Sequence, residues 1–315
     1  MKKIKIGQTD LEVAPFNFGG NVFGWTLDEK ESFEILDRYV DAGFDFIDTA
    51  DSYSHWANNG VGGQSETIIG NWMKARGNRD KVVVATKVGS GVGTEHTNSS
   101  REHILKTAEE SLKRLQTDYI DLYYTHYDDG ETPVEETLQA YDELIKAGKV
   151  RHIAVSNIKP ERLVESLEVA EKNNLPKYQA LQPLYNLVER VGYERDFAPL
   201  AEKYGLSVFP YYALASGFLS GKYRSKDDFG KSVRGKGLAK YLNEGGMKVL
   251  QALEQVSQKH NSVPAAVSLA WLAAQPNVGA PIASATSIKQ LEEILSSVTL
   301  RLDEEDLKTL NDASL

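Results

Sequence analysis

Four residues with side chains suited to proton transfer stand at related points of the chain. Asp48, Lys87 and His126 each end an apolar stretch, and the phenol of Tyr53 follows five residues after the first of them. A tyrosine hydroxyl ordinarily has a pKa near 10, and a cation held close to it lowers that value. We therefore expect Lys87 to lower the pKa of Tyr53, while Asp48 holds the Lys87 ammonium by a charged hydrogen bond.

The chemistry that this set supports is the protonation of a carbonyl group. His126 can donate an N–H to the oxygen of a bound carbonyl, and Tyr53 can protonate that oxygen as negative charge develops on it. The set contains no nucleophile, so another molecule must supply a hydride. Taken singly, each residue has an ordinary structural role as a cap, an ion-pair partner or a packing residue. Their joint placement at the ends of successive strands favours the catalytic interpretation.

The elements that must position these residues are short apolar runs that alternate with amphipathic segments. Such alternation predicts βαβ units with parallel strands, and eight units in about 300 residues favour a closed (β/α)8 barrel. The apolar runs are 15–19, 44–48, 82–87, 119–126, 150–156, 179–182, 207–211 and 280–284. The helical segments between and after them are 29–42, 66–75, 100–115, 134–147, 161–172, 194–203 and 287–296.

The alternative architecture is an open, doubly wound sheet. Such a sheet usually carries the pattern Gly-x-Gly-x-x-Gly after its first strand, where it binds a dinucleotide. Here residues 19–24 read Gly-Gly-Asn-Val-Phe-Gly, and the spacing does not match. We therefore favour the barrel.

Further segments extend beyond a minimal barrel. Residues 2–14 alternate in the manner of a polar β-hairpin, which would plug one end of the fold. Residues 246–260 and 264–275 predict an additional helix pair, and 303–311 predict a final surface helix. Since no linker-like composition divides the chain, we expect residues 1–315 to form a single domain.

Composition excludes several classes of function. The net charge of −9 argues against a general nucleic-acid binder, which needs a basic face. The chain has no cysteine, so it forms no disulfide or thiolate metal site, and we expect it to be cytoplasmic. It lacks both the apolar region of a signal peptide and the roughly 18 apolar residues of a membrane span. We expect no membrane partner.

Five blocks of the sequence resemble those of the aldo-keto reductases, in the same order and at similar spacing. They are Asp48–Tyr53, Gly63–Glu66 with Ile69-Gly70, Ala85–Lys87, Asp121–His126 and Gly148–Asn157. The resemblance covers residues 5–300 and implies NAD(P)H-dependent reduction of an aldehyde or ketone to an alcohol, without a metal. The family's catalytic tetrad falls on Asp48, Tyr53, Lys87 and His126.

The resemblance also implies where the nicotinamide would lie. It places the carboxamide against Ser156, Asn157 and Gln182, and it stacks the ring on Tyr211. Amide and hydroxyl donors and an aromatic face suit that task. Without the resemblance, the same residues would be ordinary turn and strand-end positions.

The pyrophosphate is expected along the loop 214–222, whose small residues let the backbone approach an anion. Residues 222–240 contain seven basic and two acidic residues in a chain of net charge −9, which fits an anionic cofactor. Each Lys or Arg alone would be unremarkable on a solvated surface. The contacts expected in this region are Leu214, Ser216, Gly217, Leu219, Gly221, Lys222 and Arg234.

The adenosine end is expected in the block 282–293. Many family members have an arginine where this chain has Gln290, to hold the 2′-phosphate of NADP, and an asparagine where it has Ile294. Despite these departures we expect NADP(H) by the family's habit, with NAD(H) as the alternative. The expected contacts are Ser284, Thr286, Gln290 and Glu293.

Aromatic side chains just beyond predicted strand ends are candidates for a substrate pocket. They are Phe23, Trp25, Trp56 and Tyr127. Aromatic walls suit a flat or apolar carbonyl compound, the small-molecule partner that we expect. Each of the four is also a normal packing residue.

Two other functions remain open at this point. A cofactor-binding regulatory subunit resembling the potassium-channel β subunits would share the fold and the tetrad and act through a protein partner. A barrel hydrolase would need a metal cluster or paired carboxylates. The predicted strand ends carry a single carboxylate, Asp48, which disfavours the hydrolase.

Overall fold

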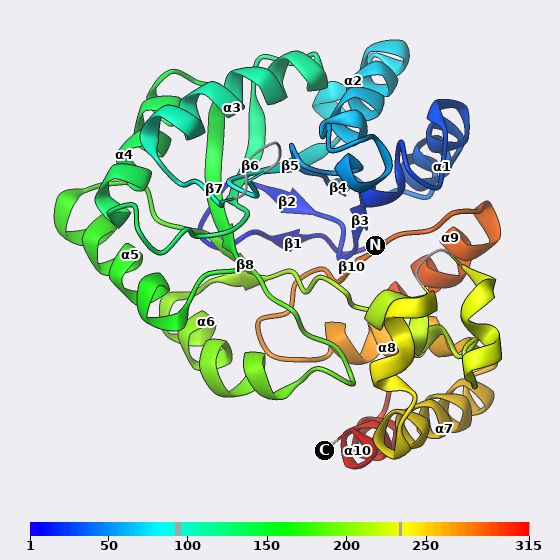
Figure 1. The fold of residues 1–315 in the computed structure, drawn as a ribbon. Coiled ribbons are helices and arrows are strands. Elements are labelled where there is room, and N and C mark those ends of the chain that lie inside the picture. The colour runs from blue at the N-terminus through cyan, green and yellow to red at the C-terminus, as the bar shows by residue number, and fades with distance from the viewer. Residues whose placement is uncertain (92–95, 233–234, 315) are drawn as a thin grey trace.

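The computed structural model describes residues 1–91, 96–232 and 235–314. At its centre lies an eight-stranded sheet in which all neighbouring strands are parallel (Figure 1). The strand order is β10 followed by β3 to β9 in sequence. The strands are β3 (Asn17–Gly19), β4 (Phe46–Asp48), β5 (Val83–Val88), β6 (Ile120–Thr125), β7 (Val150–Ser156), β8 (Ala180–Gln182), β9 (Ser207–Val208) and β10 (Ile282–Ala283).

The sheet curls until its two edges meet. The Val208 N–H donates to the Asn277 carbonyl at 2.9 Å, and the Gly279 N–H donates to the Val208 carbonyl at 3.0 Å. The Ile282 N–H donates to the Pro210 carbonyl at 3.0 Å. These bonds join β9 and the residues after it to β10 and the segment that leads into it, so the predicted (β/α)8 barrel is confirmed.

Helices cover the outside of the barrel (Figure 1). The predicted helix at 194–203 begins as a π-helical turn, Tyr193–Phe197, before α6. The predicted additional pair is α7 and α8, and the final helix α10 is capped by Asp303. The helices are α1 (Glu29–Asp41), α2 (Gln64–Arg76), α3 (Arg101–Leu115), α4 (Val134–Lys146), α5 (Pro160–Asn173), α6 (Ala198–Tyr204), α7 (Glu244–Lys259), α8 (Pro264–Ala273), α9 (Ile288–Leu295) and α10 (Glu304–Ala313).

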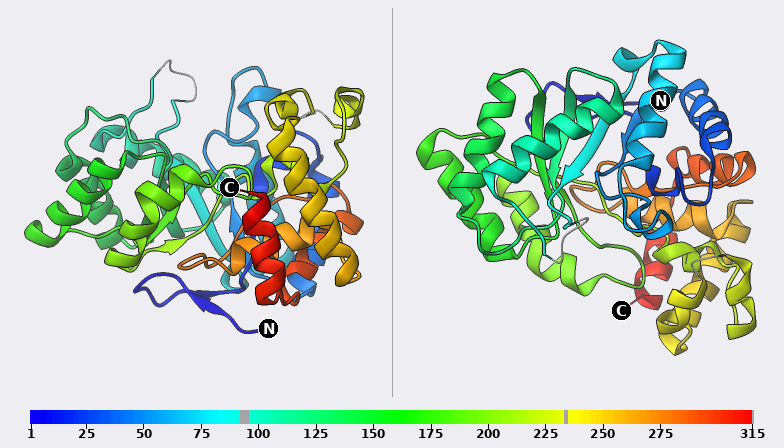
Figure 2. Two further views of the ribbon diagram at one scale, coloured as in Figure 1. Left: turned by 90° about the horizontal axis from the view of Figure 1, so that it is seen from below. Right: turned by 45° about the horizontal axis from the view of Figure 1, so that its top comes forward.

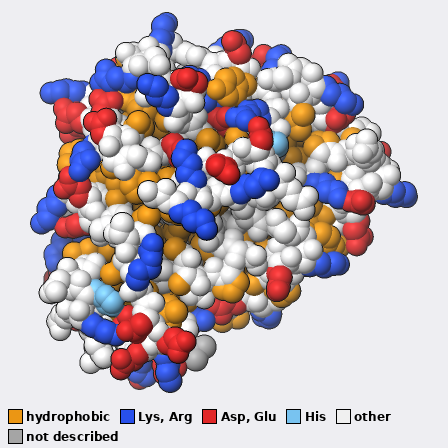
Figure 3. Space-filling model, turned by 180° about the vertical axis from the view of Figure 1, so that it is seen from behind, with side chains coloured by type: hydrophobic (Ala, Val, Ile, Leu, Met, Phe, Trp, Pro, Cys, Tyr) orange, Lys and Arg blue, Asp and Glu red, His pale blue; other side chains and the backbone are white. Residues whose placement is uncertain are grey.

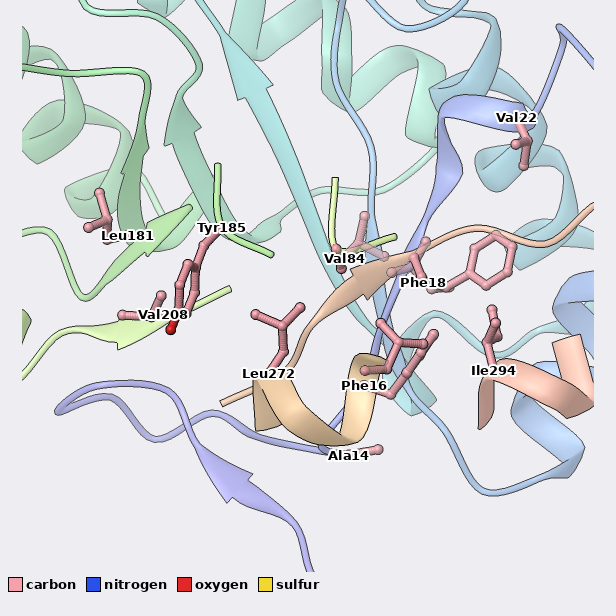
Figure 4. Packing of buried hydrophobic residues seen from close by; sticks show 14 of the residues in the cluster. Ala14, Phe16, Phe18, Val22, Val84, Leu181, Tyr185, Val208, Leu272 and Ile294 are labelled. Atoms are coloured by element: carbon pink, nitrogen blue, oxygen red, sulfur yellow. The ribbon is translucent and has the colours of Figure 1, made fainter. Parts of the chain in front are cut away.

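The larger hydrophobic core lies between the barrel and this helical layer. Phe16 lies just before β3 and Phe18 lies in it. Both side chains pack in this core with Leu272 of α8 and Ile294 of α9 (Figure 4). All four side chains are buried. Burying a side chain of this size contributes roughly 1.5–3 kcal/mol, so these contacts fix the helices on the barrel.

The barrel interior has an apolar layer below and a polar layer above. Phe46 and Phe209 pack edge to face at 5.1 Å among alanines in the lower layer. Alternate residues of a strand face the same side. The residue two positions after each lower-layer residue therefore also points into the barrel, one layer higher. In four strands that residue is polar and buried. The pairs are Phe46 and Asp48, Ala85 and Lys87, Ala154 and Ser156, and Ala180 and Gln182.

The N-terminal hairpin closes the lower end of the barrel. Strands β1 (Ile4–Lys5) and β2 (Glu12–Val13) pair antiparallel in a separate two-stranded sheet. The buried side chains of Ile6, Leu11 and Val13 join the apolar layer inside the barrel. Figure 2 (left) shows the hairpin at one end of the molecule and the light-blue loop after β4 at the other. The predicted plug is confirmed, and it keeps water from the lower end of the interior.

Among the described residues, no helix is long and apolar enough to cross a lipid bilayer. Figure 3 shows one face of the molecule, on which Lys and Arg side chains alternate with Asp and Glu side chains. That face has no extended patch of one sign.

The contact between α2 and α3 has no room for a side chain at Gly70. A Cβ there would lie 2.7 Å from the carbonyl carbon of Leu115 and closer still to the Arg114 carbonyl oxygen. We predict that Gly70→Ala lowers the free energy of unfolding by roughly 1–3 kcal/mol, as overpacking does, in urea unfolding followed by circular dichroism. Gly192, where a Cβ would meet no atom within 4 Å, is the matched helical control. Equal stability of the two alanine variants would contradict this packing.

Candidate active site

A lysine, a carboxylate and a phenol meet at the upper end of the barrel. Lys87 Nζ lies 2.6 Å from Asp48 Oδ2 and 2.9 Å from the Tyr53 hydroxyl oxygen. The Tyr53 hydroxyl donates to Asp48 Oδ2 at 3.1 Å, and Lys87 also donates to the Thr49 carbonyl at 2.7 Å. Lys87 and Asp48 are 0% and 1% exposed. Tyr53 lines a cavity above them, whereas Asp48 and Lys87 do not. The Tyr53 hydroxyl is therefore the group through which the buried ion pair can act on a molecule in the cavity.

A bond that sequence analysis missed fixes the other oxygen of Asp48. Gln182 Nε2 donates to Asp48 Oδ1 at 2.9 Å. In the sheet order β8 is four strands away from β4, so this bond crosses the barrel interior. Both carboxylate oxygens therefore have partners, as a buried ion pair requires if its burial is to be tolerated.

His126 follows β6 directly and is 9% exposed. Its ring centroid lies 6.0 Å from that of Tyr53, and both rings line the cavity. Burial lowers the pKa of His126 well below 6.5, and the positive charge of Lys87 lowers it further. The imidazole is therefore neutral near pH 7 and keeps one N–H to offer to a ligand.

The pKa of Tyr53 corrects an expectation from the sequence. Burial, and then the charge of Asp48 and the hydrogen bond to it, raise the pKa of Tyr53 well above 10. From the sequence we expected Lys87 to lower this pKa, but burial and the nearby Asp48 carboxylate have the larger, opposite effect. Burial also lowers the pKa of Lys87, while Asp48 opposes that shift. Tyr53 is thus a protonated phenol at neutral pH, suited to donate a proton.

The cavity has a volume of about 890 Å³ and extends from Tyr53 and His126 to Ile294 of α9. It brings together most of the residues predicted to bind a cofactor. Leu219, which is fully buried, and Gly221 do not line it, and Arg234 lies outside the described residues. The predicted residues that do line it are Ser156, Asn157, Gln182, Tyr211, Leu214, Ser216, Gly217, Lys222, Ser284, Thr286, Gln290 and Glu293.

The polar side chains predicted to hold the nicotinamide are bonded to one another. The Tyr211 hydroxyl donates to Asn157 Oδ1 at 3.0 Å, and Asn157 Nδ2 donates to Ser156 Oγ at 3.0 Å and to the His126 carbonyl at 2.8 Å. Ser156 Oγ in turn donates to the Gln182 carbonyl at 2.8 Å. The network reaches Asp48 through Gln182, so these side chains and the ion pair belong to one set of connected hydrogen bonds.

Comparison with known proteins agrees with this arrangement. A profile of the Aldo/keto reductase family matches residues 15–314. The chain belongs to the aldo/keto reductase family. Its members are oxidoreductases that generally use NAD(P)H.

Relatives match over almost the full chain. The "Uncharacterized oxidoreductase YrpG" of Bacillus subtilis is 36% identical over 99% of this chain and 95% of its own length. A "Probable voltage-gated potassium channel subunit beta" of Oryza sativa is 34% identical over 95% of this chain and 91% of its own. The "Aldo-keto reductase YhdN" of Bacillus subtilis is 32% identical over 99% and 93%.

In this family member the aromatic residues predicted for a substrate pocket divide into two groups. Trp56 and Tyr127 line the cavity and are 45% and 39% exposed, and Trp25 packs edge-on against Trp56 at 5.4 Å. Phe23 is fully buried and stacks on Phe18 at 5.4 Å, so it does not belong to the pocket. A position beyond a strand end can be predicted from the sequence, but the direction of a loop side chain cannot.

Several residues that line the cavity were missed. Tyr212 follows Tyr211 directly and is 53% exposed at the cavity, and its place just past a strand end was an available signal. Others lie in loops or on helices near the strand ends. They include Asn21, Glu31, His55 and Ser90.

The donors present fit a dinucleotide. Amide and hydroxyl groups line the cavity beside Tyr53, and Lys222 lines it beside the loop of small residues that includes Ser216 and Gly217. That loop adopts left-handed backbone at Ser216 and Gly217, with φ of +57° and +99°. Among the described residues, no group of three or more His, Cys, Asp and Glu side chains is arranged to hold a metal ion.

The buried ion pair makes a prediction about stability. Asp48→Leu and Lys87→Met each leave one charge buried without its partner, which costs roughly 3–5 kcal/mol of unfolding free energy. The double variant removes both charges. Measured by urea unfolding, its loss of unfolding free energy should be clearly smaller than the sum of the losses of the two single variants. The exposed pair of Arg38 and Glu292 is the control, with changes under about 1 kcal/mol. Additive losses at positions 48 and 87 would contradict the coupling.

Proposed function

We propose that this protein reduces the carbonyl group of an aldehyde or ketone to an alcohol, with NADPH as the preferred hydride donor. The observation that carries the proposal is the Tyr53 hydroxyl at the cavity wall, 2.9 Å from a fully buried Lys87. An ion pair this deeply buried is expensive in solvation free energy. Both members of the pair contact the hydroxyl of Tyr53, which faces the cavity, and this arrangement supports a catalytic role.

The side chains divide the work as follows. His126 donates its N–H to the carbonyl oxygen, which orients the carbonyl and draws electron density toward that oxygen. Tyr53 transfers its proton to the same oxygen as negative charge develops there, and the Lys87 ammonium stabilises the phenolate that remains. Asp48 touches no substrate and holds Lys87 in place. When bound, NADPH supplies the hydride that reaches the carbonyl carbon.

The preference for NADP(H) is supported at the far end of the cavity. Gln290 Oε1 accepts hydrogen bonds from the Thr286 N–H and from Thr286 Oγ1, both at 3.0 Å. This contact occupies Gln290 Oε1, so the two hydrogens on Nε2 are the donors that Gln290 can offer to a phosphate. The basic segment beginning at Lys222 adds attraction for a further negative charge.

Tyr53→Phe tests the assignment. This change removes the proton donor and leaves the ring, so turnover should fall by about 10²–10⁴-fold, while the dissociation constant for NADPH stays within about twofold because the cofactor wall is intact. Loss of NADPH absorbance, with NADH in parallel, over a panel of carbonyl compounds measures turnover and cofactor preference together. Tyr204→Phe on α6 is the control and should match the wild type. Near-normal turnover by Tyr53→Phe would refute the proposed chemistry.

The shifted pKa values predict the dependence of rate on pH. Since the pKa of Tyr53 is raised and that of His126 is lowered, both the phenol and the neutral imidazole persist through the neutral range. Carbonyl reduction should therefore hold nearly constant from about pH 6 to pH 9. Alcohol oxidation needs the phenolate, so its rate should rise by about tenfold per pH unit over the same range. A reduction rate that falls steeply across pH 8 would show that Tyr53 titrates in that range.

A cofactor-binding regulatory role is the second candidate. The relative from Oryza sativa, named as a probable channel β subunit, supports it. Such a protein would retain NADPH tightly, reduce no carbonyl compound at a useful rate, and be indifferent to Tyr53→Phe in its regulatory assay. Turnover on the carbonyl panel decides between the two candidates.

A further inference from the structure

Aromatic side chains gather where the cavity opens beside Tyr53. Trp56, Tyr127 and Tyr212 line this end and are 45%, 39% and 53% exposed. The Trp56 ring is held edge-on by Trp25 at 5.4 Å. Exposed aromatic faces on a cavity wall gain free energy when a flat apolar ligand covers them. This end of the cavity therefore suits an aromatic compound.

The same end lacks a cation for an anionic substrate. Among the described residues that line the cavity, the only Lys or Arg is Lys222, which belongs to the loop expected to hold the pyrophosphate. Lys87 is fully buried and already bonded to Asp48, Tyr53 and Thr49. A substrate carboxylate or phosphate would lose its hydration without gaining an ion pair. The charges therefore favour a neutral substrate.

One polar side chain among these rings takes no part in the proposed proton transfer. His55 lines the cavity, and its ring packs edge-on against Trp56 at 5.1 Å. Its Nδ1 lies 2.8 Å from the Ser52 carbonyl oxygen. Because a carbonyl oxygen only accepts, Nδ1 must carry the hydrogen. In the neutral imidazole, Nε2 is then a hydrogen-bond acceptor, and it has no partner among the described residues.

The loop that carries His55 is fastened in place. Ser54 has a left-handed backbone with φ of +72°, and its Oγ donates to the Phe23 carbonyl at 2.6 Å. Asn58 Nδ2 donates to the Ser54 carbonyl at 2.9 Å and to the Gly24 carbonyl at 3.2 Å. His55 is therefore presented in a fixed position and not on a free loop, so its acceptor is preorganised for a ligand.

We propose that His55 recognises a hydroxyl group of the substrate, and that the substrates are neutral aromatic aldehydes or ketones that carry an alcohol or phenol hydroxyl. The substrate hydroxyl donates to His55 Nε2 while Trp56, Tyr127 and Tyr212 contact the ring. This assignment rests on the proposed carbonyl reduction and adds to it a substrate class and a specificity-determining residue. A site built to bond a hydroxyl discriminates strongly against the analogue that lacks the donor.

The test compares substrates that differ only in the donor. The kcat/KM with NADPH is measured for 3- and 4-(hydroxymethyl)benzaldehyde and for their methyl ethers, which keep the ring but cannot donate. The wild type should prefer at least one hydroxymethyl compound over its ether by about tenfold, the value of one good hydrogen bond. His55→Leu should bring that ratio close to one, and His103→Leu on α3, outside the cavity, should leave it unchanged. His55→Phe, which keeps a ring against Trp56, replaces the leucine variant if that variant does not fold.

Each contrary outcome has a distinct meaning. Equal kcat/KM for both alcohol–ether pairs in the wild type, or a preference that survives in both His55 variants, overturns the role of His55. Faster reduction of 3- or 4-carboxybenzaldehyde than of the hydroxymethyl compounds overturns the neutral substrate class. Reduction of aliphatic but not aromatic aldehydes overturns this assignment and leaves the proposed function standing. If the wild type reduces no carbonyl compound, the proposed function fails and this assignment fails with it.

Discussion

The ion pair between Asp48 and Lys87 is the interaction on which the rest of the site depends. Both side chains are almost completely removed from water, and a buried charge of this kind is tolerated only when its partner and its hydrogen bonds are complete. Here the bonds are complete, because Thr49 and Tyr53 contact Lys87 and Gln182 contacts Asp48. The position of the Tyr53 hydroxyl follows from this arrangement, since it is one of the groups that completes it.

The barrel supplies the dry environment that makes the pair effective. Alanines and two phenylalanines fill the layer below the pair, and the N-terminal hairpin closes the end beneath that layer. With water kept out from below, electrostatic interactions in the polar layer are stronger than they would be at a surface. The same burial raises the pKa of Tyr53 and lowers that of His126, so one physical cause prepares both groups for their proposed roles.

The parts of this arrangement that follow chain periodicity could be predicted from the sequence. Strand ends were readable from apolar runs, and they brought Asp48, Lys87 and His126 to one end of the barrel. The bond between Gln182 and Asp48 could not be predicted, because it spans strands that meet only across the closed barrel. The direction of the Tyr53 pKa depends on the balance of burial, carboxylate and ammonium, which requires distances.

Loop side chains were the least predictable features. Phe23 lies beyond a strand end, as a pocket residue would, yet its ring turns into the core against Phe18. A specific role for His55 could not be predicted, because it depends on a hydrogen bond to the Ser52 carbonyl, which fixes the tautomer of the imidazole. Neither fact has a periodic signal in the chain, because irregular backbone sets each side-chain direction individually.

Titration of Tyr53 is the most direct test of whether burial and Asp48 keep this phenol protonated. Tyrosine labelled with ¹³C at Cζ reports whether each phenol is protonated, and the Tyr53 signal among the 15 tyrosines is assigned by its loss in Tyr53→Phe. We expect the Tyr53 signal to remain that of a phenol beyond pH 10, and Asp48→Asn to lower the pH at which it titrates. If the Tyr53 signal of the wild type titrates below the ordinary tyrosine value near 10, burial and Asp48 do not hold the proton on this phenol.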